Sequence, residues 1–164
     1  MKRVAVTGLG VISPVGNDIP TFWNALCSGT CGIGPITKFD ATDYPVKLAA
    51  EVRDFDPRQY MEKLDILHSD VYTHFAMAAA CQAVADSGIA GTLDAERVGV
   101  YIGSGIGGIA TFMTEHSKLL NRGPRRVSPY FIPMMIPIMA SSMIAIRYHF
   151  HGPAMPMVTA CASG

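Results

Sequence analysis

The sequence predicts an α/β fold with a mainly parallel sheet, because short apolar strands alternate with helices along the chain. Two of the strand segments, residues 3–10 (RVAVTGLG) and 97–108 (RVGVYIGSGIGG), are apolar runs that end in glycines. A third, residues 157–160 (MVTA), comes near the end of the chain. The clearest helix, residues 69–88, lies between the first two strands and has apolar residues at helical spacing.

The elements before that helix are predicted to be short. After the strand at 3–10, Asn17 or Asp18 caps a helix with Pro20 in its first turn, and this helix runs to Gly29. Glycines and prolines then dominate, with one strand expected at 47–52 (KLAAEV).

The later elements have clearer boundaries. Ser69 or Asp70 caps the helix at 69–88, and Gly88 stops it. The strand that begins at Arg97 runs into a glycine turn, here defined as residues 103–108, and a helix follows through Phe112.

The last part of the chain is expected to form a loop, a helix and a strand. The loop ends near Pro137, a buried helix covers 138–148, and the strand at 157–160 leads into a helix that begins around Cys161.

Composition narrows the classes of function. The chain has 164 residues, enough for one domain, and its 13 basic and 13 acidic residues give no net charge that would recruit nucleic acid or an anionic membrane. With 49% hydrophobic and only 16% charged residues, much of the surface is expected to meet more protein. The N-terminal apolar stretch is broken before a signal-peptide core can form, so a cytoplasmic location is expected.

Two further features of the sequence bear on membrane insertion and on metal binding. The uncharged residues between Arg126 and Arg147 are as many as a bilayer span needs, but Pro129, Pro133 and Pro137 argue against one continuous helix. The four cysteines show no zinc or disulfide spacing, so we expect no metal.

The glycine turn offers one alternative function. Gly103, Gly105 and Gly108 satisfy the G-x-G-x-x-G pattern of a dinucleotide site between a strand and a helix. Arg125 and Arg126 lie where a partner for a 2′-phosphate could be sought. No clear strand precedes these arginines, so a structural turn that lets helix and strand pack tightly is the favoured interpretation over an NADP site.

Cys161 is the stronger candidate for chemistry. Its neighbours, from Thr159 to Gly164, are all small, which leaves room for a carbonyl group to approach the sulfur. A thiol at a helix N-terminus has its thiolate form favoured by the helix dipole, and nearby amides could hold an oxyanion. A small buried residue in a tight corner explains the same pattern equally well. None of the five histidines is placed beside Cys161 by the sequence as its base.

Six segments together resemble a known family. The chain is similar to β-ketoacyl-acyl-carrier-protein synthases of the second type in VAVTGLGVISPVGND, GIGPITKFDATDYPV, DFDPRQYM, GVYIGSGIGG, GPRRVSPYFIPMMIP and VTACASG. The resemblance implies the thiolase-like fold with αβαβα layers, of which residues 1–164 would be the N-terminal half, ending just after the nucleophile. It also implies a cytoplasmic homodimer that needs no cofactor.

The resemblance assigns roles to four residues. Cys161 is the implied catalytic nucleophile, which takes an acyl group from acyl-carrier protein before decarboxylative condensation with malonyl-acyl-carrier protein in fatty-acid elongation. Ile106, Phe131 and Ala162 are implied to line the acyl pocket, Phe131 from across the dimer interface. The family's two active-site histidines and a lysine belong to the C-terminal half, so the 1–164 chain alone is expected to be inactive.

One segment departs from the family pattern. Family members are usually basic at the positions of residues 63–72, where acidic carrier protein docks, whereas here only Lys63 and His68 are basic and Asp65 is acidic. The leading hypothesis is therefore a condensing enzyme represented by its nucleophile-bearing part. The alternatives are a non-catalytic half-subunit or partner of such a synthase and, with less support, an NADP-binding module.

Overall fold

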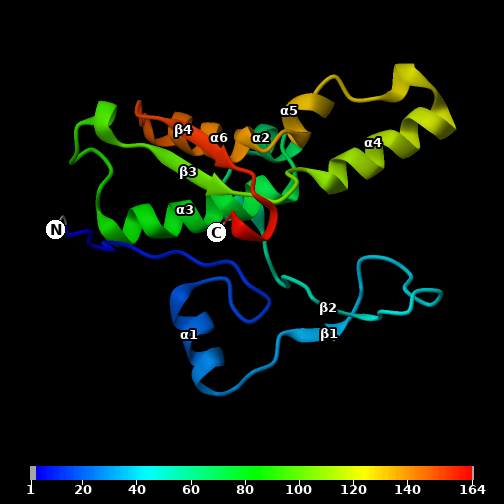
Figure 1. Ribbon diagram of the computed structural model, residues 1–164, viewed down its shortest axis with the longest axis horizontal. Coiled ribbons are helices and arrows are strands. Elements are labelled where there is room, and N and C mark those ends of the chain that lie inside the picture. Colours follow the sequence, from blue (N-terminus) through cyan, green and yellow to red (C-terminus); the bar gives the residue numbers. More distant parts are fainter. Residues whose placement is uncertain (1–2, 164) are drawn as a thin grey trace.

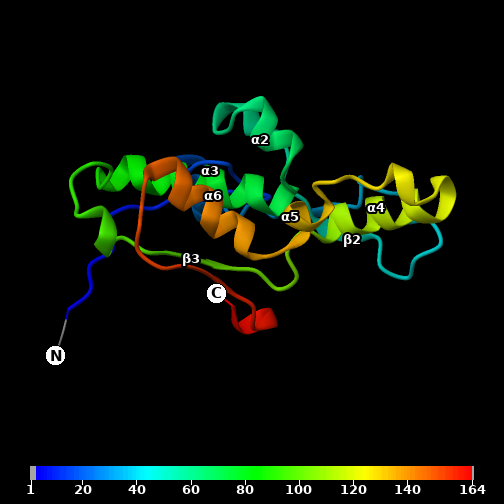
Figure 2. The same cartoon turned by 90° about the horizontal axis from the view of Figure 1, so that it is seen from above.

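Two parallel strands and two helices form the centre of the molecule. The computed structural model describes residues 3–163. Strands β3 (Val100–Gly103) and β4 (Ala154–Met157) pair in parallel. Helices α3 (Val71–Ser87) and α6 (Ile138–Tyr148) pack together on the same side of these strands (Figure 2). The parallel pairing and the α/β class predicted from the sequence are both confirmed.

The core lies between the two helices and β3. Its buried side chains are those of Met61, Met77, Val100, Ile144 and Ala145. Where α3 and α6 meet, the fully buried residues are small, including Ala78 and Ala140. Small side chains allow the two helices to approach closely and exclude water between them.

The central helices have the boundaries that the sequence predicted. Asp70 caps α3, its side chain accepting a hydrogen bond from the Tyr72 amide at 3.2 Å, and Gly88 ends the helix in the left-handed conformation. Helix α6 covers the predicted range 138–148. Between them, α4 (Ile109–Arg122) starts directly after the glycine turn and extends away from the central elements (Figure 1).

Three predictions for individual elements were wrong. Residues 3–10 form no strand, and their amides turn to α3 instead: Leu9 N donates to Asp86 Oδ2 at 2.9 Å. The last strand lies at 154–157 rather than 157–160. It tolerates Pro156 because, in the described sheet, β4 pairs only with β3 and a proline can occupy the unpaired side of an edge strand.

The third difference is α5 (Phe131–Met135), which forms where a loop was expected. Pro133 lies in the first turn of this helix, where backbone amides have no partner within the helix, so its missing N–H costs no hydrogen bond. The uncharged stretch 127–146 is thus divided among a loop and two helices. In the described residues we find no helix with the length and apolarity to cross a bilayer.

The N-terminal region, here residues 3–50, lies to one side of the body, here residues 51–163 (Figure 1). It contains α1 (Ile19–Cys27), capped by Asp18 as predicted, and an antiparallel pair formed by β1 (Ile33–Pro35) and β2 (Leu48–Ala50). The remaining helices are α2 (Lys63–Leu67) and the short 3₁₀ helices η1 (Pro57–Gln59), η2 (Ala95–Arg97), η3 (Pro124–Arg126) and η4 (Ala160–Ala162).

Candidate active site

Cys161 lies on an exposed turn that directly follows β4. This cysteine turn, here residues 159–163, contains η4 and is closed by hydrogen bonds from Thr159 N to Ser163 Oγ at 2.9 Å and from Ala162 N to Thr159 O at 3.1 Å. Cys161 and Ala162 are exposed. The helix expected to begin at Cys161 appears in the described residues as this single 3₁₀ turn, and Gly164 lies outside them. The amides of Ala162 and Ser163 are both used within the turn.

The glycine turn packs against the cysteine turn. Strand β3 carries Gly103 beside Met157 of β4, and Ser104 N donates to Met157 O at 3.0 Å. A side chain at Gly103 would overlap the carbonyl of Ser163, so only glycine permits this approach of the two backbones. The two turns that follow the parallel strands therefore form one continuous surface.

The other side of the glycine turn contacts the end of α5. Gly107 has a φ of 83°, a conformation that favours glycine, and Gly108 N donates to Met135 O at 2.9 Å. Within the turn, Ser104 Oγ accepts from Gly107 N at 3.0 Å. Ile106 lies at the tip of the turn and is 66% exposed. The backbone of the glycine turn is thus held at one end against the cysteine turn and at the other end against α5.

Phe131 lies at the start of α5, the helix whose other end contacts the glycine turn. Its ring packs on Phe112 of α4, with ring centroids 6.1 Å apart. Both rings line an apolar cavity of about 120 Å³, with Leu119 and Val127 among the other lining residues. Of the four residues that the sequence singled out, Cys161 and Ala162 lie on the cysteine turn, Ile106 lies on the adjoining glycine turn, and Phe131 packs against α4.

Two buried carboxylates near the turns were not singled out as site residues by the sequence. Asp70 accepts hydrogen bonds from Thr111 at the start of α4. Glu115 accepts from Ser128 N at 2.7 Å and pairs with Lys118. The Lys118 ammonium, together with the Ser128 amide, lowers the pKa of the Glu115 carboxyl from its ordinary value. The capping pattern indicated Asp70 only as a cap of α3, and no local signal indicated Glu115.

The five histidines lie elsewhere in the described chain. His68 stacks on Tyr130, with ring centroids 3.7 Å apart, and His116 stacks on Phe112. The rest lie in or after the central helices: His74 is buried in α3, His149 ends α6 and His151 contacts Glu96. Within residues 3–163, no hydrogen bond joins any of them to Cys161.

The geometry does not favour a nucleotide in the glycine turn. The backbones of Ser163 and Met135 occupy the space beside Gly103 and Gly107 where a pyrophosphate would rest. Arg125 and Arg126 lie in η3 rather than at the end of a strand. The described residues also contain no cluster of three or more metal-ligating side chains.

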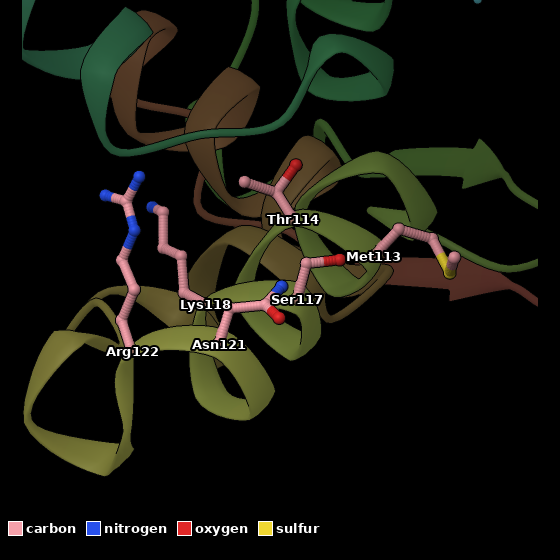
Figure 3. Close-up of a pocket in the computed structure, with 6 residues that line it drawn as sticks. All are labelled: Met113, Thr114, Ser117, Lys118, Asn121 and Arg122. Atoms are coloured by element: carbon pink, nitrogen blue, oxygen red, sulfur yellow. The ribbon is translucent and has the colours of Figure 1, made fainter.

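A hollow of about 530 Å³ lies along α4, remote from the cysteine turn in sequence and lined from one helix alone. Figure 3 shows its lining residues, with the long side chains of Lys118 and Arg122 projecting to the same side of α4. It is open and contains neither a cysteine nor a histidine. The surface formed by the glycine and cysteine turns therefore remains the candidate active site.

Comparison with known proteins identifies the family of the chain. The family model described as "Beta-ketoacyl synthase, N-terminal domain" matches residues 1–164. The chain belongs to the β-ketoacyl synthase family. It is 49% identical over 164 residues to 3-oxoacyl-acyl-carrier-protein synthase 2 of Coxiella burnetii, and 45% identical to the protein of that name from Synechocystis sp.. The alignments cover 99% of this chain but only 40% and 39% of the two relatives.

Solved structures of ketosynthases share the fold. The ishigamide ketosynthase/chain length factor matches with a TM-score of 0.83 and 28% identity, over 97% of this chain and 40% of that one. A β-ketoacyl synthase from Burkholderia phymatum matches with a TM-score of 0.80 over 100% of this chain and 41% of its own, at 23% identity. The thiolase-like α/β fold predicted from the sequence is thereby confirmed.

Proposed function

We propose that the protein is a 3-oxoacyl-acyl-carrier-protein synthase of fatty-acid elongation, and that residues 1–164 are its N-terminal, nucleophile-bearing part. The observation that carries the proposal is the match over 99% of the chain to synthases of that name at 44–49% identity. The exposed Cys161, on a turn packed against the glycine turn, supports it independently.

The proposed reaction has two stages. In the first, the Cys161 sulfur attacks the carbonyl carbon of an acyl thioester, a tetrahedral oxyanion forms and collapses, and the carrier thiol leaves with the proton that Cys161 gives up. In the second, malonyl-carrier protein loses CO₂, and the resulting carbanion attacks the acyl carbon on Cys161. The carbon–sulfur bond to Cys161 breaks, which releases a 3-oxoacyl product two carbons longer on the carrier protein and leaves the Cys161 thiolate, which takes a proton from water to restore the thiol.

The residues around Cys161 suit the first stage. Cys161 and Ala162 are exposed on a turn of small residues, so an acyl group can reach the sulfur without displacing a large side chain. Ile106 stands at the tip of the adjoining glycine turn and would form one wall for the acyl chain. Phe131, packed on Phe112, would contribute a wall to the pocket of the other protomer, across the dimer interface.

The proposed partners follow from the same function. They are acyl-carrier protein in its acyl and malonyl forms, a second copy of the protein in a homodimer, and the C-terminal half of the synthase, which would supply the two histidines and the lysine; the proposed location is the cytoplasm. One solved neighbour, at 24% identity and a TM-score of 0.75, is described as a polyketide acyl-carrier protein in complex with its ketosynthase. On this chain, α2 presents exposed Leu64 and Leu67 beside Lys63, so docking there would rely more on apolar contact than on charge.

The test is covalent loading of the full-length protein. After incubation with an acyl thioester of carrier protein, we expect the intact mass to rise by one acyl group, and the Cys161→Ser variant to remain unmodified. Cys27 and Cys31 are also exposed, so Cys27→Ser and Cys31→Ser are matched controls that should still be acylated. An unmodified wild-type protein would refute the proposal and favour the non-catalytic partner subunit.

A further inference from the structure

Asp70 joins the starts of two helices through one buried side chain. It is the N-cap of α3, where Oδ1 accepts from Tyr72 N at 3.2 Å. Its other oxygen, Oδ2, accepts from Thr111 N at 2.8 Å and from Thr111 Oγ1 at 2.6 Å. Asp70 is only 6% exposed, and none of the salt bridges in the described residues involves it. Its carboxylate is thus stabilised by helix N-termini rather than by a cation.

Helix α4 depends on the hydrogen bond between Asp70 and the Thr111 amide for its N-terminal cap. Gly108, the residue at the cap position of α4, has no side chain that could accept from the first amides of the helix. Thr111 is the third residue of α4, the position whose amide a cap side chain ordinarily satisfies. Asp70 supplies that acceptor from a different helix, 41 residues earlier in the sequence.

The bond also controls the position of the glycine turn. This turn ends at Gly108, where an added Cβ would lie 3.0 Å from the Asp70 Cβ, so Asp70 is in close contact with the end of the turn. A cavity of about 270 Å³ adjoins the contact between Asp70 and Thr111, and Asp70, Thr111, Glu115 and neighbouring residues line it. Packing on the side of this cavity is therefore incomplete, and the hydrogen bonds of Asp70 to Thr111 hold the start of α4, where the glycine turn ends.

From this geometry we infer that Asp70 is a positioning residue for acyl transfer to Cys161. Its effect on the site is transmitted through Thr111 and the glycine turn. The inference rests on the proposed function. Asp70 fixes the start of α4, α4 fixes Gly108, and the other end of the turn lies against Ser163 of the cysteine turn. A displaced turn would move Ile106 and the wall that faces the acyl chain without touching the sulfur itself.

The informative variant is Asp70→Asn in the full-length protein. An amide has the shape of the carboxylate but presents an NH₂ group in place of one oxygen, so one of the two helix starts loses its acceptor. We expect single-turnover acyl transfer to Cys161 to slow by roughly 10- to 100-fold, the range that a misplacement of about 1 Å produces. The rate of Cys161 alkylation by iodoacetamide, which needs no acyl wall, should stay near that of the wild type.

A matched control lies at the start of α1. Asp18 accepts from Thr21 N at 2.7 Å and from Thr21 Oγ1 at 2.9 Å, the same pair of donors that Asp70 receives from Thr111. Asp18→Asn should therefore weaken a helix cap to a similar degree and leave acyl transfer unchanged. Thr111→Ser, which keeps both donors, should retain transfer, whereas Thr111→Val, which keeps only the amide, should slow it several-fold.

The outcomes separate the two proposals. If the wild-type protein loads no acyl group on Cys161, the proposed function fails. If it loads, and Asp70→Asn loads at the same rate per alkylatable Cys161, the positioning role is refuted. Should Asp70→Asn not fold, Thr111→Val decides: unchanged transfer and unchanged amide exchange at residues 103–110 would equally refute the role.

Discussion

The N-terminal region and the body differ in what surrounds their apolar side chains. None of residues 3–50 is buried, although Val4, Trp23 and Ile33 are among them. In the body, Ile144 and Met77 are each 3% exposed and belong to one core between α3, α6 and β3. Both parts contain well-formed elements, so the difference is not one of local structure.

What separates them is contact between elements distant in sequence. Helix α1 has a good cap, and β1 and β2 pair with each other, but these bonds join residues close along the chain. The body is closed by pairs such as β3 with β4, which a parallel arrangement forces to be far apart in sequence. Local hydrogen bonds therefore suffice to form elements, whereas a core needs the long-range pairs.

The largest effect expected from this comparison is on stability. Ile144→Ala should lower the free energy of unfolding of the full-length protein by about 2–5 kcal/mol, because it removes core methyl groups and leaves a cavity. Trp23 is 61% exposed on α1, so its replacement by alanine should lower the free energy of unfolding by roughly 0.5 kcal/mol or less. Urea denaturation of the two variants measures both values.

Ile146→Ala is the matched control, because the same side chain on the same helix is 71% exposed. It should resemble Trp23→Ala rather than Ile144→Ala. A loss for Trp23→Ala as large as that for Ile144→Ala would break the comparison, since it would show that residues other than 3–163 bury the N-terminal region.

The same distinction explains which elements the sequence predicted. Helices α3 and α6 were predicted with nearly their final boundaries because caps, stops and apolar spacing are local signals. The strand expected at 3–10 has the right composition, yet a strand also needs a neighbouring strand, and the amides of Leu9 and Val11 bind α3 side chains instead. A single sequence does not encode that choice of partner in any local pattern.

In the candidate site, too, features with a local sequence signal were predicted, whereas contacts between residues distant in sequence were not. Cys161 was indicated by its small neighbours, and the glycine turn by its spacing, both within a few residues. The bond between Asp70 and Thr111 spans 41 residues, and that between Glu115 and Ser128 spans 13. Such pairs join two unremarkable polar residues, so only the folded chain reveals them.

A second comparison concerns two buried glutamates, Glu51 at the junction with the N-terminal region and Glu115 within the body. Glu51 accepts from Thr37 Oγ1 at 2.6 Å and closes the loop between β1 and β2, whereas Glu115 ties α4 to the segment before α5. Glu115→Gln removes the pairing with Lys118 and should destabilise the protein by about 1–2 kcal/mol. Glu51→Gln should loosen only residues 37–50, which amide exchange would resolve.

The lowered pKa values of Glu51 and Glu115 also lead to a prediction about stability at acidic pH. The Lys118 ammonium lowers the pKa of Glu115, and the Thr37 hydroxyl lowers that of Glu51, each from an ordinary value of 4.5. Their stabilisation is therefore present above that value and lost as the pH falls below it. Protection of the Ser128 and Thr37 amides should decline together in this range; protection of Ser128 that is unchanged in Glu115→Gln would contradict the role of Glu115.

The smallest effect expected is a pH dependence restricted to the body, which contains all five histidines. His74 is 8% exposed in α3, where its Nε2 lies 3.2 Å from the Ile66 carbonyl and 3.1 Å from Ser69 Oγ. Burial lowers the pKa of His74 from its ordinary value of 6.5, and the carbonyl and Asp70 only partly oppose this.

The folded state disfavours protonation of His74. The free energy of unfolding is therefore at its full value above about pH 6.5 and declines as the pH falls below that value. Amide exchange, corrected for its intrinsic pH dependence, should show α3 losing protection in this range while α1 does not. His74→Gln should remove the decline, whereas His151→Gln, at an exposed pair with Glu96, should leave it in place. An equal decline in α1 would mean that the two regions unfold as one unit, and the contrast between them would then lie in burial alone.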